Sequence, residues 1–176
     1  ARLWDGGYAI CGAVGSGEAF VLRDPNGIRP AFWYSDDEIC AVASERPVIQ
    51  TTFNVSAEDV HELEPGQMIA IDASGNTALR QVLAPKANAR CSFERIYFSR
   101  GSDMDIYNER KQLGRELAPM VAEAVEGDLR NTIISYIPNT AETAFFGMVE
   151  GLRGICPAVR AEKIVIKDIS LRTFIA

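Results

Sequence analysis

The chain lacks the features that mark several large classes of protein. Its 176 residues include a single histidine, and its four cysteines are far apart and form no Cys-x-x-Cys pair. Scattered thiols of this kind are typical of a reduced, cytoplasmic protein rather than of a disulfide framework. No apolar run approaches about eighteen residues, and no basic segment followed by an apolar run stands near the start, so we expect neither a membrane span nor a signal peptide.

A basic surface is also missing. The formal net charge is −6, and the only modest basic cluster, Arg110, Lys111 and Arg115, falls in a helical pattern where a solvated face is the better interpretation. Phosphate backbones need many lysines and arginines on one face, so we predict no nucleic-acid partner. The apolar content of 47% and the charged content of 24% are those of an ordinary globular protein.

One run of eight residues is unusual for a turn. Residues 23–30 read Arg-Asp-Pro-Asn-Gly-Ile-Arg-Pro and separate two strand-like segments, 19–22 and 31–34. Proline presets its own φ and Asn-Gly tolerates positive φ, so the run predicts a tight turn. A turn alone needs neither the arginines nor the aspartate. We therefore expect Asp24 to pair with Arg23 or Arg29 and to brace a β-corner.

The first half of the chain predicts an antiparallel sheet. The glycines of residues 12–17 precede a strand rather than a helix, so they indicate a hairpin turn and not a dinucleotide-binding loop. Cys11 and Cys40 fall in strand patterns, where we expect buried small side chains. Strands separated by turn residues at this spacing indicate antiparallel pairing. They are expected at residues 8–11, 19–22, 31–34, 39–43 and 68–72, with a short helix or turn at 48–53.

The pattern changes after residues 84–89, a small and polar stretch that we interpret as a connection. Residues 95–99 favour a strand or an extended segment, and residues 100–103 a loop. From residue 107 to about 125 the spacing becomes helical, and Pro119 implies a kink or an early break. One apolar stripe is predicted for this helix. It comprises Leu113, Leu117, Met120, Val121 and Ala124.

A strand, a helix and a second strand complete the predicted elements. The strands are expected at residues 132–137 and 162–167, and the helix from about 141 to 152. Asn139 is a candidate N-cap, with Glu142 as its return partner. This order predicts one parallel βαβ unit.

The chain is therefore predicted to be α+β, with an antiparallel β layer followed by the opening of a parallel α/β sheet. With its motifs in this order, it resembles the glutamine amidophosphoribosyltransferase family. The resemblance extends along the whole chain. It rests on Arg23–Pro30, Ala43-Ser44-Glu45, Glu64-Pro65-Gly66, Cys91–Arg100, Arg110 with Gly114-Arg115-Glu116-Leu117, and Arg172–Ile175.

The resemblance implies two domains. Residues 1–86 would be the C-terminal part of a class II glutaminase domain of the N-terminal-nucleophile type, and residues 87–176 the N-terminal part of a phosphoribosyltransferase domain. Such an enzyme transfers glutamine-derived ammonia to phosphoribosyl pyrophosphate and gives 5-phosphoribosylamine, the first step of de novo purine synthesis. Glutamine and phosphoribosyl pyrophosphate are then the implied small-molecule partners, Mg²⁺ the implied cofactor, and a homo-oligomer the implied assembly.

The family's catalytic residues are not matched within the chain. Its nucleophile is an N-terminal cysteine whose own amine serves as base, whereas residue 1 is alanine. The family's double-aspartate loop is not matched either. We therefore assign no catalytic residue and expect the chain by itself to be an inactive fragment.

Three residues are candidates for binding phosphoribosyl pyrophosphate. Thr140 matches the family's hydroxyl that helps hold the Mg²⁺ of this substrate, but Asn139 stands where the family has an acid. The alternative is that Asn139 and Thr140 only cap a helix. Lys167 and Arg172 resemble the family's substrate-closing loop, which is one residue shorter here and lacks its tyrosine. The alternative for both is a solvated strand end.

Cys91 stands where some family members have the first of four cysteine ligands of an iron–sulfur cluster, and the alternative is a free thiol. His61 is interpreted as a structural histidine at or near the surface. Two other functions remain open for the chain. It would be either a non-catalytic binding or assembly module on the same fold, or the glutaminase part of another class II amidotransferase.

Overall fold

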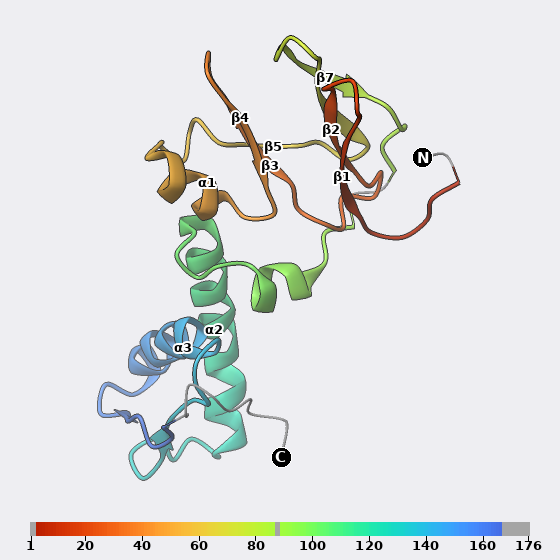
Figure 1. Cartoon of the computed structure of the whole chain (residues 1–176). Helices are drawn as coiled ribbons and strands as arrows, with labels where there is room; N and C mark the ends of the chain where they lie inside the picture. Colours follow the sequence, from red (N-terminus) through yellow and green to blue (C-terminus); the bar gives the residue numbers. More distant parts are fainter. Residues whose placement is uncertain (1–2, 87–88, 167–176) are drawn as a thin grey trace. The chain divides into compact units, whose positions relative to one another are not determined.

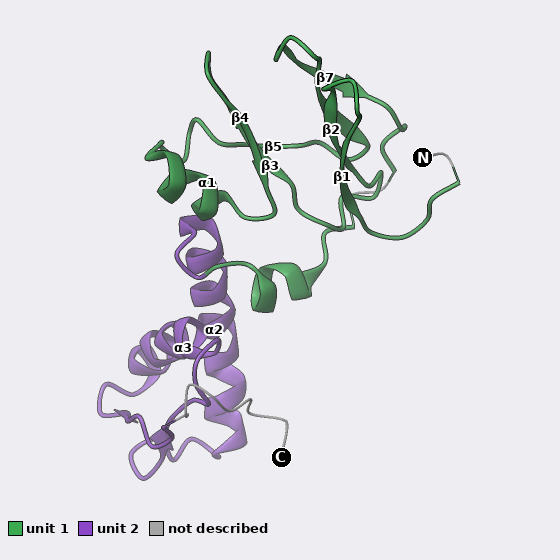
Figure 2. Ribbon diagram, viewed as in Figure 1, with its two compact units in different colours: residues 1–100 green, residues 101–176 purple. Residues whose placement is uncertain are grey.

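The computed structural model describes residues 3–86 and 89–166. The chain divides into two compact units, residues 1–100 and residues 101–176 (Figure 2). Antiparallel sheets together with helices confirm the α+β class. The boundary predicted after residue 86 refers to family domains rather than to compact units, and it stays a prediction. The two units are described separately below.

A four-stranded antiparallel sheet with the order β1-β2-β6-β7 forms one part of the first unit (Figure 1). The hairpin predicted at residues 12–17 is confirmed, because the N–H of Val14 donates to the carbonyl of Glu18 at 2.7 Å. The fourth strand was not predicted, since all of its side chains are exposed and it shows no apolar alternation. The strands are β1 (Ala9–Ala13), β2 (Ala19–Arg23), β6 (Gln67–Ile71) and β7 (Thr77–Gln81).

A second antiparallel sheet in this unit has the order β4-β3-β5. It confirms the strands expected near 31–34 and 39–43, and the short helix expected near 48–53 is also present. Ala31, Leu63 and Ile69 form one buried cluster of the unit, so residues next to β3, β5 and β6 share a core. The elements are β3 (Phe32–Ser35), β4 (Cys40–Ala43), α1 (Arg46–Phe53) and β5 (His61–Glu62).

The extended segment predicted at residues 95–99 is wrong. Residues Glu94–Phe98 form one π-helical turn, η1, in which the N–H of Ser99 donates to the carbonyl of Glu94 at 2.7 Å. The aromatic and β-branched residues of this stretch favour a strand in isolation. In the structure the Glu94 side chain at the start of this turn is buried.

The second unit begins with a long helix, α2 (Met104–Ala124), whose N-cap Asp103 accepts the N–H groups of Asp105 and Ile106. The helix predicted from residue 107 is confirmed, but the early break at Pro119 is wrong. Val121 and Ala122, beyond the proline, pack against the same core as Ala118 before it. Pro119 removes one helical hydrogen bond, but the packing of residues before and after it keeps α2 continuous.

Most of the apolar stripe predicted for α2 is exposed, and of its members Val121 packs against the core. Leu113, Leu117 and Met120 are 44%, 45% and 65% exposed. The buried positions follow a spacing of four and include small residues instead, because α2 lies very close to the next helix at these points. They are Ile106, Arg110, Gly114 and Ala118.

A parallel βαβ unit follows, as predicted, but its strands are short. β8 (Ile133–Ile134) pairs in parallel with β9 (Arg160–Ala161), and α3 (Glu142–Ile155) connects them. The longer strands expected at 132–137 and 162–167 are wrong for the described residues. Beyond the two residue pairs, the N–H of Glu162 donates to the carbonyl of Ile134 at 3.0 Å and the N–H of Ile164 to the hydroxyl of Ser135 at 3.3 Å.

The cap predicted for α3 is also wrong. Ala141 occupies the N-cap position and makes no side-chain cap bond. Asn139 contributes its backbone carbonyl, which accepts the N–H of Glu142 at 3.2 Å. The Glu142 side chain accepts the hydroxyl of Tyr136 rather than returning to residue 139. This bond raises the pKa of Tyr136.

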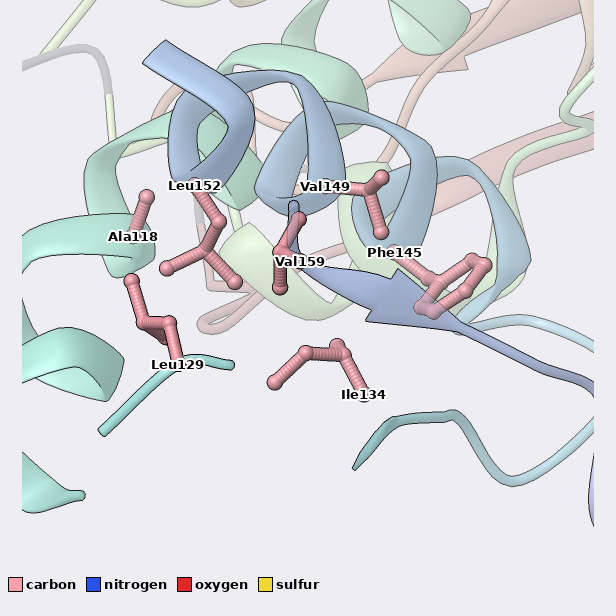
Figure 3. Packing of buried hydrophobic residues seen from close by; sticks show 7 residues of the cluster. All are labelled: Ala118, Leu129, Ile134, Phe145, Val149, Leu152 and Val159. Atoms are coloured by element: carbon pink, nitrogen blue, oxygen red, sulfur yellow. The ribbon is translucent and has the colours of Figure 1, made fainter. Parts of the chain in front are cut away.

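Buried side chains from α2, α3 and both strands form the core of the second unit. Figure 3 shows Leu152 and Val149 of α3 above Val159 and Ile134, with Phe145 beside them. Leu152 is fully buried. This unit therefore has its own hydrophobic core, which the β8–α3–β9 crossover encloses.

Two glycines allow α2 and α3 to approach each other closely. A Cβ on Gly114 would overlap the carbonyl oxygen of Ala144, and a Cβ on Gly147 would overlap that of Lys111. Across the same helix pair, Glu150 binds Lys111 at 2.6 Å and Arg115 at 2.8 Å, which lowers the pKa of Glu150. Within residues 3–86 and 89–166, no helix is both long enough and apolar enough to cross a membrane.

Candidate functional site

The β-corner, defined as residues 23–30, connects β2 of the first sheet to β3 of the second. Asp24 is completely buried in it. Its carboxylate accepts backbone N–H groups from both sides of the corner, at distances of 3.0–3.3 Å. The donors are Tyr8, Asn26, Ile28 and Arg29.

The predicted pairing of Asp24 with an arginine is therefore wrong, although its role as a brace is confirmed. A carboxylate that accepts four backbone N–H groups fixes the backbone at four points, whereas an ion pair would fix it at one. The phenol of Tyr8 lies close enough that its pKa is raised, first by burial and then by the negative charge of Asp24. Gly27 has a φ of +64°, which explains why glycine follows asparagine in this turn.

Arg23 is the second buried charge of the corner. Its guanidinium donates to the carbonyls of Arg29 at 2.8 Å and Gly27 at 3.1 Å, and also to the carbonyl of Leu63. It forms an ion pair of 2.8 Å with Glu62 of β5. Arg23 thus connects the corner to Glu62 of β5 and to Leu63, the residue after β5.

The connecting segment, defined as residues 89–100, is attached to the same corner. The N–H of Ala89 donates to the carbonyl of Asn26 at 2.7 Å, and just before the segment the N–H of Lys86 donates to the carbonyl of Pro25 at 2.8 Å. Charged residues of the segment also form ion pairs with residues of the sheets and of the β-corner. These ion pairs are Arg90–Glu62, Glu94–Arg29 and Arg100–Glu45.

A cleft of about 390 Å³ lies where these pieces meet. Three of the segments that carry the family resemblance contribute to it: the β-corner, residues 43–45 and residues 91–100. Both the Arg29–Glu94 pair and Glu45 line it. The lining residues are Ala9, Arg29, Pro30, Ser44, Glu45, Glu94, Phe98 and Ser99.

The sequence did not predict that Glu45 and Glu94 are the partners of arginines in other segments. The sequence did contain a hint of these pairs, because the acid and the arginine of each pair lie in two different motif segments. Opposite charges alone do not identify a pair, however, since the chain has 24 acidic and 18 basic residues. The fold had to bring residues 29 and 94 together.

The structure places only one of the three predicted substrate-binding residues. Thr140 is exposed in the turn that precedes α3, next to the exposed Asn139. Lys167 and Arg172 lie outside the described residues. The predicted substrate-binding role of Thr140 stays a prediction.

The described residues do not supply a preformed metal site. Among residues 3–86 and 89–166, no group of three or more histidine, cysteine or acidic side chains could hold a metal ion. Thr140 therefore fits Mg²⁺ only as one hydroxyl ligand of an ion that phosphates and water also coordinate. Cys91 is a half-buried free thiol, and the described residues gather no four-thiolate set for an iron–sulfur cluster around it.

The other predictions for single residues are partly confirmed. His61 is at the surface, as predicted, and its ring lies 5.1 Å from that of Trp33. Cys40 is half-buried, but the predicted burial of Cys11 is wrong. β1 alternates between exposed and half-buried residues, and Cys11 falls on its exposed side.

The two cysteines are expected to differ in reactivity. Burial raises the pKa of the Cys40 thiol, whereas Cys11 is exposed. Because the thiolate is the reactive form, iodoacetamide at neutral pH is expected to modify Cys11 roughly several-fold faster than Cys40. A time course by mass spectrometry checks this order. Equal rates in the folded chain would contradict it, and equal rates in urea serve as the control.

The chain shows clear similarity to known proteins. The family model described as "Glutamine amidotransferases class-II" matches residues 1–90, about half of the chain. This chain belongs to the class-II glutamine amidotransferases. In this amidotransferase the β-corner and residues 43–45 fall inside the matched region, and the connecting segment begins at its end.

Curated relatives of the amidotransferase chain extend the similarity into its second unit. An amidophosphoribosyltransferase of Lachancea kluyveri is 31% identical over 155 residues, which is 81% of this chain and 29% of the relative. One from Bacillus subtilis is 34% identical over 137 residues, which is 76% of this chain and 27% of the relative. The chain thus spans less than a third of the length of these relatives.

A solved structure agrees with the curated relatives. The glutamine phosphoribosylpyrophosphate amidotransferase of B. subtilis, solved in complex with ADP and GMP, matches with a TM-score of 0.71 and 29% identity. The match covers 97% of this chain and 35% of the solved one. The resemblance predicted from the sequence motifs is confirmed.

Proposed function

We propose that this chain is part of an amidophosphoribosyltransferase. The reaction would hydrolyse glutamine and transfer its ammonia to phosphoribosyl pyrophosphate, giving 5-phosphoribosylamine and pyrophosphate, the first step of de novo purine synthesis. The glutamine and phosphoribosyl pyrophosphate sites would belong to different domains. Residues 1–86 would be the C-terminal part of the glutaminase domain, and residues 87–176 the N-terminal part of the phosphoribosyltransferase domain.

The observation that carries this proposal is the likeness to amidophosphoribosyltransferases across both compact units. The match to the B. subtilis structure covers 97% of the chain, so it includes the β8–α3–β9 unit as well as the glutaminase-type sheets. A glutaminase joined to a different partner domain would explain only the first half. The same likeness disfavours a non-catalytic module, since the named relatives are transferases.

Thr140 gives this function a specific test. In the whole protein, Thr140→Ala is expected to weaken the binding of phosphoribosyl pyrophosphate with Mg²⁺ about tenfold, because the loss of a hydroxyl contact to a charged group costs about 1.5 kcal/mol or more. Isothermal titration with and without Mg²⁺ measures the change. The effect should be confined to the titration that contains Mg²⁺.

Two matched variants sharpen the result. Asn139→Asp restores the acid that the family has at this position and is expected to tighten the Mg²⁺-dependent binding. Thr132→Ala removes the hydroxyl that donates to the carbonyl of Asp128 and lies outside the turn, so it is expected to leave the affinity unchanged. Unchanged affinity in Thr140→Ala would contradict the metal role of Thr140. Failure of the unaltered protein to bind phosphoribosyl pyrophosphate would contradict the proposed function itself.

The cofactor and the assembly are also proposals. Mg²⁺ would be held mainly by the pyrophosphate of the substrate, with the exposed Thr140 as one ligand. An iron–sulfur cluster at Cys91 would need three more thiolates from elsewhere in the whole protein. A homo-oligomer remains the expected assembly.

A further inference from the structure

The connecting segment is fastened to the β-corner more firmly than a passive linker would be. Backbone bonds from Lys86 and Ala89 reach the carbonyls of Pro25 and Asn26, which are two central residues of the corner. The segment then makes its ion pairs with the β-sheet unit. Rigid attachment at several points indicates that the position of this segment matters, because linkers between independent domains make few contacts.

The ion pairs of the segment differ in burial. The three arginines, Arg29, Arg90 and Arg100, are similarly exposed, at 51%, 48% and 64%. The acids differ, because the side chain of Glu94 is 11% exposed, against 24% for Glu62 and 20% for Glu45. Exposed pairs contribute little to stability, but removal of the partner of a largely buried carboxylate is costly. The Arg29–Glu94 pair is therefore the energetically important one.

Glu94 also controls the backbone of the segment. It is the first residue of η1, and its carbonyl accepts the N–H of Ser99, which closes the π-helical turn. Single π-turns are rare and often occur at functional sites. Loss of the Glu94–Arg29 contact would remove the buried anchor at the start of this turn.

We propose that Arg29 and Glu94 are a positioning pair that holds residues 94–98 in the π-helical form against the β-corner. Resting on the proposed amidotransferase function, we further infer that this anchor couples glutamine hydrolysis to ammonia use, because residues 94–100 lead directly into the second unit. The β-corner motif then has two roles. It braces the sheets through Asp24, and it fixes the outgoing chain through Arg29.

Hydrogen exchange on the chain itself tests the anchor independently of any activity. Glu94→Gln, Arg29→Gln and the double variant form a cycle that isolates the pair. Each single variant is expected to speed exchange of the Ser99 amide about tenfold or more, and the double variant no further, because the same contact is lost in all three. Unchanged exchange in the single variants, or additive effects in the double variant, would overturn the proposal.

A matched control separates this pair from general loosening. Arg90→Gln removes an ion pair from the same segment, but its acid, Glu62, lies outside the π-helical turn and keeps Arg23 as a partner. This variant is expected to leave exchange of the Ser99 amide unchanged. An equal increase in Arg90→Gln would show that the whole segment has detached and would overturn the specific role of Glu94. Amides of β1 and β2 report whether any variant unfolds the sheet, and Glu94→Gln keeps the shape of the side chain to avoid this.

The coupling is measured on the whole enzyme, as the ratio of glutamate released to 5-phosphoribosylamine formed. Glu94→Gln is expected to raise this ratio several-fold, since small misplacements of a reacting group have large effects on its use. Addition of external ammonia should restore product formation in the variant. An unchanged ratio would overturn the coupling. Absence of both products in the unaltered enzyme would refute the proposed function, and the exchange experiment would still decide the anchor.

Discussion

Asp24→Ala is expected to unfold the first unit at a much lower urea concentration than the unaltered chain. The variant removes the completely buried acceptor of four backbone N–H groups, three of them in the β-corner and the fourth that of Tyr8. Each buried donor without a partner costs about 1–3 kcal/mol, so a total loss of about 3 kcal/mol or more is expected. Tryptophan fluorescence follows this transition, since Trp4 and Trp33 both lie in the first unit.

An exposed turn with the same chemistry provides the control. Asp72 accepts the N–H groups of Ser74 and Asn76, both at 2.9 Å, but it lies in an exposed turn. Water replaces the lost acceptor there, so Asp72→Ala is expected to cost about 1 kcal/mol or less. Asp24→Asn should fall between the two, because its amide group faces two N–H donors in either orientation. A loss in Asp24→Ala no larger than that in Asp72→Ala would contradict the importance of burial at the corner.

Gly114→Ala is expected to destabilise the second unit, although alanine is the better helix former. The new Cβ would overlap the carbonyl oxygen of Ala144 and lie 2.8 Å from the backbone nitrogen of Met148. Backbone atoms cannot move aside as a side chain can, so α2 and α3 must separate. Overpacking of this kind costs about 1–3 kcal/mol or more, which exceeds the gain of about 1 kcal/mol in helix propensity. Thermal unfolding followed by helical circular dichroism measures the difference.

Gly154→Ala is the matched control and should have the opposite sign. Gly154 lies in the last turn of α3, is exposed, and has no atom within 4 Å of a Cβ built on it. Only the propensity gain of up to about 1 kcal/mol is expected there. If both variants stabilised the unit, the close approach of the two helices at Gly114 would be refuted.

The local elements of the first unit were well predicted from the sequence. Turn residues such as those at 12–17 and 23–30 restrict the backbone wherever they stand, so their effect does not depend on the fold. β7 was not predicted, because it lacks such a local signal. Its exposed side chains carry no apolar pattern, and only pairing with β6 makes it a strand.

The candidate site was predicted less completely than the elements that build it. The motif segments were predicted correctly, whereas the role of Thr140, assigned from its match to the family's hydroxyl residue, stays a prediction. The ion pair between Arg29 and Glu94 spans 65 positions of the chain, and no local pattern selects it among the many possible charge pairs. Residues 94–98 form a π-helical turn instead of the predicted extended segment, and Glu94 at its start makes that distant contact.

The sequence by itself determined the α+β class, the antiparallel pairing of the first strands, the β-corner and the family resemblance. These follow from side-chain periodicity, turn chemistry and motif order, which are local properties of the chain. The tertiary structure alone decided which groups Asp24 and Arg29 bind and which face of α2 is buried. Both depend on close contacts between distant segments. Gly114 and Ala118 let the backbone of α2 approach that of α3 closely, so this face of α2 is buried. The larger side chains of Leu113, Leu117 and Met120 remain exposed.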